Sequence, residues 1–340
     1  MLKVLEEIPA GLLELKSDQL AQALEGPTLF HLPGRRPEPL FVSVLLHGNE
    51  TTGWNALRGL LASHGAEPLP RALSFFIGNV AAAAKGVRRL EDQPDFNRIW
   101  LAGTTPEHEM TRRVLEELRQ RRVFASVDIH NNTGVNPHYA CVNRLDHRFF
   151  HLATLFQRTV VHFTRPEGVQ TSAFADLCPS VTLECGQVGS LAGLSHVRDY
   201  LSACLHLAEI PAHPIHAQDI DLYHTVAVVK VPDEVSFGFG AEEGDLRFPE
   251  DLERRNFTEL EPGFLLARRR LGSEARLVVA DESGREVGDR YLEESDGELR
   301  TRLKMTPSMF TLNKTIIRQD CLGYFMERVG LEIPPFEKGG

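Results

Sequence analysis

The 340-residue sequence is poor in cysteine, in basic charge and in long apolar runs, and each shortage excludes a class of protein. Its five cysteines are scattered without a CxxC pair, which argues against a disulfide framework and favours reduced thiols. Lys plus Arg number 37 against 47 for Asp plus Glu, and the formal net charge of −10 argues against a dedicated nucleic-acid binder. No apolar stretch is long enough to span a bilayer, and residues 1–7 lack the apolar core of a signal peptide. We therefore expect a cytoplasmic protein with no nucleic-acid or membrane partner.

The pattern of the chain changes after Pro211 and Pro214, and its length and 42% hydrophobic content suit two domains. Before this point short apolar runs alternate with helical patterns, which predicts a mostly parallel central sheet flanked by helices. The expected strands cover residues 39–46, 72–77, 123–129, 139–142, 159–163 and 180–183, and the expected helices cover 50–64, 105–122 and 191–207. Beyond it, strands expected at 225–231, 264–267, 276–280 and 299–303 are separated by Gly-rich and acidic turns. We predict an α/β domain over 1–212 and a smaller β-rich domain over 213–340.

The tetrapeptide His47-Gly48-Asn49-Glu50 follows the first of these buried strands and precedes a helix. An imidazole and a carboxylate three residues apart, at a glycine-relaxed turn, can point at the same spot. That spot would lie at the C-terminal edge of the sheet, where α/β proteins place their ligands. Such a pair suits a divalent metal, although HxxE is a common motif and is weak evidence when it stands alone.

Three further motifs fall at strand ends or in loops of the same part: Asp95-Phe96-Asn97-Arg98, Asp128-Ile129-His130 and Leu183-Glu184-Cys185-Gly186. Each has an ordinary interpretation on its own. A histidine at a strand end is usually a satisfied core residue, a single glutamate usually lies on the surface or caps a helix, and Asn-Arg usually lies in a solvated loop. Their common placement on one expected edge of the sheet indicates a site.

The residue types of these motifs predict a hydrolytic zinc centre. His47, Glu50 and His130 would supply three ligands and leave a fourth position for water, whose pKa zinc lowers towards neutrality. Glu184 would act as general base and later as general acid. Asp128 could accept the free imidazole N–H of His130, or it could point away from the metal.

An arginine and an asparagine would bind the substrate. The guanidinium of Arg98 matches a carboxylate bidentately, and Asn97 would assist it. The sequence therefore predicts a substrate that carries a carboxylate.

The four motifs, in this order, resemble those of the succinylglutamate desuccinylase/aspartoacylase family, a branch of the zinc carboxypeptidase superfamily. The resemblance implies a zinc-carboxypeptidase-like α/β domain followed by a smaller β-rich domain, and one Zn²⁺ per chain. It also implies hydrolysis of an N-acyl amino acid such as an N-succinyl or N-acetyl derivative. Residues 256–260 and 263–267 also look like a segment of the family's second domain.

The chain departs from the family pattern at two places. Family members carry an arginine shortly before D-x-N-R that polarises the scissile carbonyl. Arg89 is the better candidate, although its spacing to Asn97 is one residue longer than expected, and Arg88 is the other. Both arginines could instead be solvated loop charges. Aspartoacylases place a tyrosine pair after a segment like 309–313, whereas this chain has Thr315-Ile316-Ile317-Arg318. Tyr324 or Arg318 could substitute for that tyrosine.

Two other functions stay open on sequence alone. A metallocarboxypeptidase or amidase acting on short peptides would use the same metal and the same base. A non-catalytic, metal-stabilised scaffold would be favoured by the loss of Glu184 or of a ligand, and all four residues are present. A homodimer is expected only because it is the commonest assembly.

Overall fold

The computed structural model describes residues 2–65 and 67–331, which divide into two compact units. The first unit holds the described residues 2–65, 67–131, His138–Leu222 and 330–331. The second holds Asn132–Pro137 and Tyr223–Val329. Because the short segment 132–137 belongs to the second unit, the division is not a single cut in the chain, and the predicted boundary between residues 212 and 213 stays a prediction.

The first unit is built on a sheet whose strands follow the order β1-β2-β4-β3-β5-β8-β6-β7. Their bounds are β1 Lys3–Leu5, β2 Thr28–Leu32, β3 Leu40–Val44, β4 Leu73–Ile77, β5 Ala125–Asn132, β6 Tyr139–Val142, β7 Thr159–His162 and β8 Ser180–Gln187. β1 and β2, β3 and β4, β3 and β5, and β6 and β7 pair in parallel, whereas β2–β4 and β6–β8 are antiparallel. β3, β4 and β5 are buried along their whole length, as expected for strands covered on both faces.

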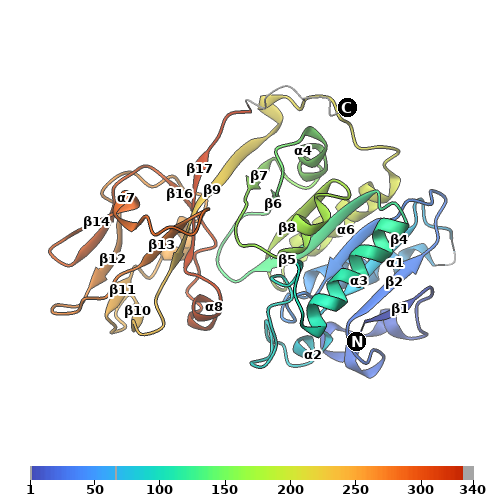
Figure 1. The fold of residues 1–340 in the computed structure, drawn as a ribbon, viewed down its shortest axis with the longest axis horizontal. Helices are drawn as coiled ribbons and strands as arrows, with labels where there is room; N and C mark the ends of the chain where they lie inside the picture. The colour runs from blue at the N-terminus through green and yellow to red at the C-terminus, as the bar shows by residue number, and fades with distance from the viewer. Residues whose placement is uncertain (1, 66, 332–340) are drawn as a thin grey trace. The chain divides into compact units, whose positions relative to one another are not determined.

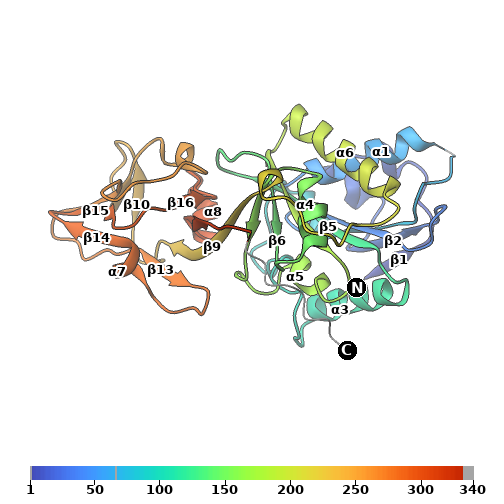
Figure 2. The same cartoon turned by 90° about the horizontal axis from the view of Figure 1, so that it is seen from above.

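Helices cover both faces of this sheet, with α1 Thr52–His64 and α6 Leu191–His206 on one face and α3 Pro106–Gln120 and α5 Gln170–Phe174 on the other (Figure 2). Shorter elements are η1 Leu12–Glu14, η2 Ser17–Gln22, α2 Val80–Ala83, α4 His147–Thr154 and η3 Ala217–Asp219. α3 begins where the sequence predicts, with Thr105 as N-cap and Pro106 in the first turn. The predicted fold class is confirmed (Figure 1).

Apolar side chains anchor the loop that carries the Asp-Phe-Asn-Arg motif. Phe96 and Trp100 are buried in one cluster with Phe41, Phe76 and Phe174. The rings of Phe41 and Phe174 stack at 4.6 Å between centroids, and the Trp100 indole N–H donates to the Phe96 carbonyl at 2.8 Å. Because its apolar residues are fixed in the core, this irregular segment can hold the polar residues between them in defined positions.

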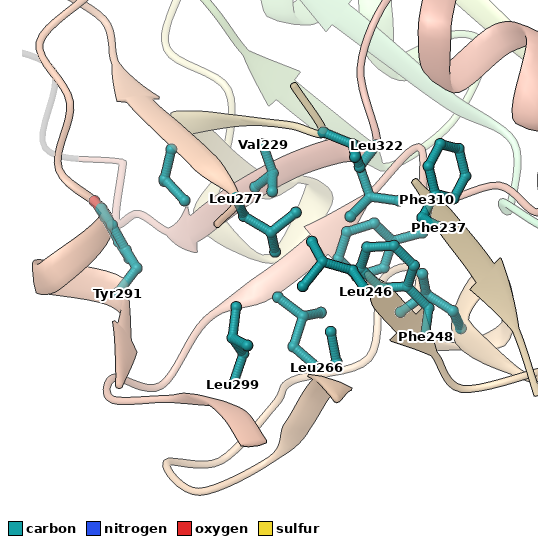
Figure 3. Close-up of a cluster of buried hydrophobic side chains, with 14 of the residues drawn as sticks. Val229, Phe237, Leu246, Phe248, Leu266, Leu277, Tyr291, Leu299, Phe310 and Leu322 are labelled. Carbon is teal, nitrogen blue, oxygen red and sulfur yellow. The ribbon is translucent and has the colours of Figure 1, made fainter. Parts of the chain in front are cut away.

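The second unit is β-rich, as predicted. It contains β9 Asp221–Lys230 from Tyr223 onwards, β10 Phe237–Phe239, β11 Leu246–Phe248, β12 Leu265–Arg269, β13 Val278–Asp281, β14 Leu292–Ser295, β15 Glu298–Thr301, β16 Thr306–Ser308 and β17 Gly323–Arg328, with η4 Leu252–Arg255, α7 Gly288–Tyr291 and α8 Lys314–Gln319. β10, β11, β12, β15 and β14 form one five-stranded sheet. Its apolar core gathers Phe237, Leu246, Phe248, Leu266 and Leu277 among others (Figure 3).

Residues 132–137 are held by hydrogen bonds within this second unit. The side-chain amide of Asn256 donates to the carbonyls of Val135 and Phe310, at 3.0 and 2.8 Å, and its oxygen accepts from the Phe310 N–H at 2.8 Å. A Cβ on Gly134 would lie 2.0 Å from the Phe310 carbonyl oxygen, so only glycine fits there. The chain immediately after β5 is therefore fixed by the β-rich unit.

None of the described helices combines the length and the apolar character that crossing a bilayer requires. A cytoplasmic location stays a prediction.

A buried histidine gives the first unit a pH-dependent stability. His31 on β2 is 4% exposed and its Nδ1 lies 2.7 Å from the Ser74 hydroxyl. Burial, and then the nearby Arg121 charge, lower its pKa from 6.5 to about 4. The unfolded chain therefore binds a proton at His31 at a higher pH than the folded chain does, so folding is favoured above pH 6.5 and loses stability as the pH falls towards 4.

We predict that His31→Asn flattens this dependence. The free energy of unfolding of the wild type should fall by about 2–3 kcal/mol more than that of the variant between pH 7 and pH 4, as the shift in the His31 pKa requires. Urea denaturation at pH 7, 5.5 and 4 measures the difference. Parallel pH profiles of the two proteins would contradict the assignment.

Candidate active site

A tight turn after β3 presents His47 and Glu50 together. Leu45 has a positive φ of 56°, and the Glu50 N–H donates to the His47 carbonyl at 3.1 Å before α1 begins. A Cβ on Gly48 would lie 2.3 Å from the Ala82 carbonyl carbon, so the turn needs glycine at this position. The predicted order of strand, turn and helix is therefore present, and the side chains of His47 and Glu50 contact each other.

The structure brings His47, Glu50 and His130 into one buried group, called the metal group below because these three residue types could hold a metal ion. One potential ligand atom from each lies within 4.8 Å of the others, and it is the one such group among the described residues. Nδ1 of His47 lies 2.8 Å from Oε1 of Glu50, and Nδ1 of His130 lies 2.8 Å from Oε2. Two nitrogens and a carboxylate converging in this way form a donor set that suits zinc.

Each histidine also meets an outer carboxylate through its other nitrogen. Nε2 of His130 lies 2.7 Å from Asp128, which accepts a second bond from Ser43, so the contact expected for Asp128 is present. Nε2 of His47 lies 3.0 Å from Asp95. Such outer carboxylates fix the tautomer and the ring orientation of metal-binding histidines. Sequence reasoning left the Asp128 contact as one of two alternatives and missed that of Asp95, although Asp95 stood in a recognised motif.

The charges of this group support one another. Burial opposes the charged imidazoles, but Glu50 and Asp95 raise the pKa of His47, and Asp128 and Glu50 raise that of His130 well above its usual value. Burial likewise opposes the Glu50 carboxylate, yet the two imidazoles hold its pKa far below the ordinary range. The ionised form of Glu50 is therefore favoured by the two neighbouring imidazoles.

Glu184 has the opposite environment. It lies in β8, the strand next to β5 in the sheet, and is 6% exposed. Burial raises its pKa to about 7; the positive charges of His130 and His47 lower it, and Glu50 and Asp128 raise it. A carboxyl group with a pKa near neutrality can accept a proton and give it back.

Asn131 ties these parts together. Its backbone N–H donates to Glu50 at 3.0 Å, and its side-chain oxygen accepts from the N–H of Thr52 at 3.2 Å. Its side-chain amide donates to the Gly186 carbonyl at 2.9 Å, two residues beyond Glu184. Asn131 therefore links the first turn of α1, the metal group and the end of β8.

The residues predicted to bind substrate lie beside the group. The Asn97 oxygen accepts from the Gln170 N–H at 2.8 Å, and its nitrogen lies 3.1 Å from Nε2 of His130. The half-buried Arg98 donates to the Asn97 carbonyl at 2.8 Å. Their role in binding a substrate carboxylate stays a prediction.

Of the two candidate arginines, Arg88 is the one beside the metal group. Its guanidinium bonds to Asp95 at 2.8 Å and lies 3.8 Å from Glu50. Arg89 instead donates to the carbonyls of Leu90 and Gln93. The sequence analysis preferred Arg89. Two neighbouring arginines in an irregular loop show no periodicity, so the sequence could not tell which of them faces the site.

The segment that replaces the family tyrosine pair forms α8 in the second unit. Arg318, one of the two residues considered as a substitute, donates to the carbonyls of Val231, Pro232 and Val235. Its guanidinium thus links backbone segments within that unit.

Comparison with known proteins agrees with the arrangement. Residues 39–202 match the succinylglutamate desuccinylase/aspartoacylase catalytic domain. No curated protein sequence matches the chain at a significant level.

Solved structures show the same fold over most of the chain. Succinylglutamate desuccinylase from Chromobacterium violaceum is 18% identical with a TM-score of 0.56, covering 87% of each chain. Succinylglutamate desuccinylase/aspartoacylase from Rhodobacter sphaeroides is 13% identical with a TM-score of 0.57, covering 88% of each. Murine aminoacylase 3 is 17% identical with a TM-score of 0.53, covering 87% of this chain and 97% of its own.

The matched catalytic domain contains all four motifs of the site, from His47 to Glu184. Over residues 39–202 the chain is therefore similar to the catalytic domain of the succinylglutamate desuccinylase/aspartoacylase family.

Proposed function

We propose that the protein is a zinc-dependent amidohydrolase that removes the acyl group from an N-acyl amino acid. The observation that carries the proposal is the convergence of His47, Glu50 and His130, whose potential ligand atoms lie within 4.8 Å of one another, with the buried Glu184 on the strand next to that of His130. The two glutamates also differ in environment: the imidazoles lower the pKa of Glu50, whereas burial raises the pKa of Glu184 to about 7. Environments that shift the pKa values of two carboxyl groups in opposite directions distinguish a metal ligand from an acid–base group.

The donor set fits zinc. His47, Glu50 and His130 offer nitrogen, oxygen and nitrogen, and Asp95 and Asp128 hold the outer imidazole nitrogens. When bound, zinc would polarise the amide carbonyl and lower the pKa of a water molecule towards neutrality.

The proton transfers are assigned to Glu184. Its carboxylate would take a proton from the attacking water and deliver it to the amine nitrogen as the C–N bond breaks. A pKa near neutrality suits both directions of transfer, because neither the ionised nor the protonated form is strongly favoured at physiological pH.

Arginines would hold the substrate. Arg98, with Asn97, would bind a carboxylate of the amino acid. For the developing oxyanion the contacts favour Arg88, since its guanidinium lies 3.8 Å from Glu50, whereas Arg89 is bonded to backbone carbonyls of its own loop. Arg89 remains the candidate that sequence spacing prefers.

The general-base role predicts that Glu184→Gln retains the metal and loses turnover by about 10²–10⁴-fold, because the proton acceptor is removed. Initial rates of amine release and metal analysis measure the two effects. Glu109→Gln, at an exposed position of α3, is the matched control and should leave both unchanged. Wild-type turnover in Glu184→Gln would exclude this residue as the base.

The ligand assignment predicts that His130→Ala binds far less zinc than the wild type, because one of three protein ligands is lost. Metal content after dialysis, measured by elemental analysis, tests this. His151→Ala is the control, since His151 lies on α4 outside the metal group. A full zinc complement in His130→Ala would refute the assignment.

The reaction class is tested by amine release from zinc-loaded protein over a substrate panel, with and without chelator. The panel holds N-succinylglutamate, N-acetylaspartate, other N-acyl amino acids and short peptides. We expect chelator-sensitive release from acyl amino acids and not from peptides. Release from peptides alone would instead make the protein a metallocarboxypeptidase or amidase that uses the same site.

A further inference from the structure

Tyr139 lies directly opposite Glu184. In the antiparallel pair β6–β8, Tyr139 is in register with Glu184, Ala140 with Leu183 and Cys141 with Thr182. Side chains of directly opposed residues stand on the same face of a sheet, with Cβ atoms about 4.5–5.5 Å apart. Both side chains are buried, at 2% and 6% exposure. Tyr139 is therefore the cross-strand neighbour of the group assigned to proton transfer.

The other two side chains of this β6–β8 row are poorer hydrogen-bond donors to the carboxylate than the Tyr139 phenol. The Thr182 hydroxyl already pairs with the Thr171 hydroxyl at 3.1 Å. Burial, and then the Glu184 carboxylate, raise the pKa of the Cys141 thiol well above its usual value, so this neighbour stays a neutral thiol, which is a weak donor. The phenol of Tyr139 is the strong donor in the row, and a buried phenol normally has a hydrogen-bond partner.

We propose that Tyr139 is a positioning residue that holds the Glu184 carboxylate in its working orientation across the β6–β8 ladder. The inference rests on the proposed function of Glu184. A free glutamate side chain has several rotamers, and a phenol fixed at a strand start restricts them. The first residue of β6 thus serves the reaction without touching the substrate.

The inference is first tested without any turnover. The chain has five tyrosines, so ¹³C labelling at their Cζ atoms gives a simple NMR spectrum. The Tyr139 signal is assigned by its loss in Tyr139→Phe. In Glu184→Gln this signal should move, whereas that of Tyr200, whose hydroxyl donates to the Leu152 carbonyl, should not. An unmoved Tyr139 signal would overturn the inference.

Kinetics provide the second test. Tyr139→Phe should lower kcat about tenfold, as loss of an outer-sphere partner does, with KM within about twofold and zinc content unchanged. Tyr200→Phe removes an equally buried hydroxyl and should leave kcat unchanged. In single-turnover experiments, Tyr139→Phe should cause no further loss in the Glu184→Gln background. An equal further loss, or an unchanged kcat, would show that Tyr139 does not act through Glu184.

The two proposals fail separately. If the wild type released no amine from any substrate, or Glu184→Gln kept full activity, the proposed function would fail. The NMR comparison would still decide whether Tyr139 holds Glu184.

Discussion

The carboxylate of Glu50 is the interaction on which the site depends. It is nearly enclosed, and three groups converge on it: the two Nδ1 atoms of His47 and His130 and the backbone N–H of Asn131. A buried charge is tolerated only when it is paired and hydrogen-bonded, and removal of one partner leaves the others uncompensated. The turn after β3, the end of β5 and the outer carboxylates must therefore stay in place together. A divalent metal would enter a site whose negative charge is already arranged for it.

Much of the fold could be predicted, because the buried strands of the first unit read as apolar runs ended by polar or glycine residues. The prediction of residues 139–142 as a strand is confirmed without change, and that of 191–207 as a helix differs by one residue. The strand predicted at 180–183 extends to Gln187, since Glu184 and the residues after it are polar or small and hid its continuation. β1, β10, β11 and β16 were missed because three-residue strands carry too little alternation to be recognised, and the longer strands β2, β14 and β17 were missed as well.

The site was predictable where its residues follow strand ends, and obscure where an irregular loop or a long separation intervenes. His47, Glu50 and His130 stand at the carboxyl ends of β3 and β5, so topology alone brings them together. The pairing of Asp95 with His47 spans 48 residues and depends on how a loop is anchored by its apolar residues, which no local pattern encodes. The partner of Glu184 across the sheet depends on register, and the sequence of an isolated strand does not specify register.

Hydrogen bonds of Asn131 connect Glu50 to the end of the strand that carries Glu184. Asn131 contacts the Glu50 carboxylate, the start of α1 at Thr52 and the Gly186 carbonyl beyond Glu184. Its neighbours in the chain, 132–137, are fixed within the β-rich unit through Asn256. A reaction that needs a carbonyl and a proton acceptor at defined separation gains from such connections, because misplacement by 1 Å can cost a large factor in rate.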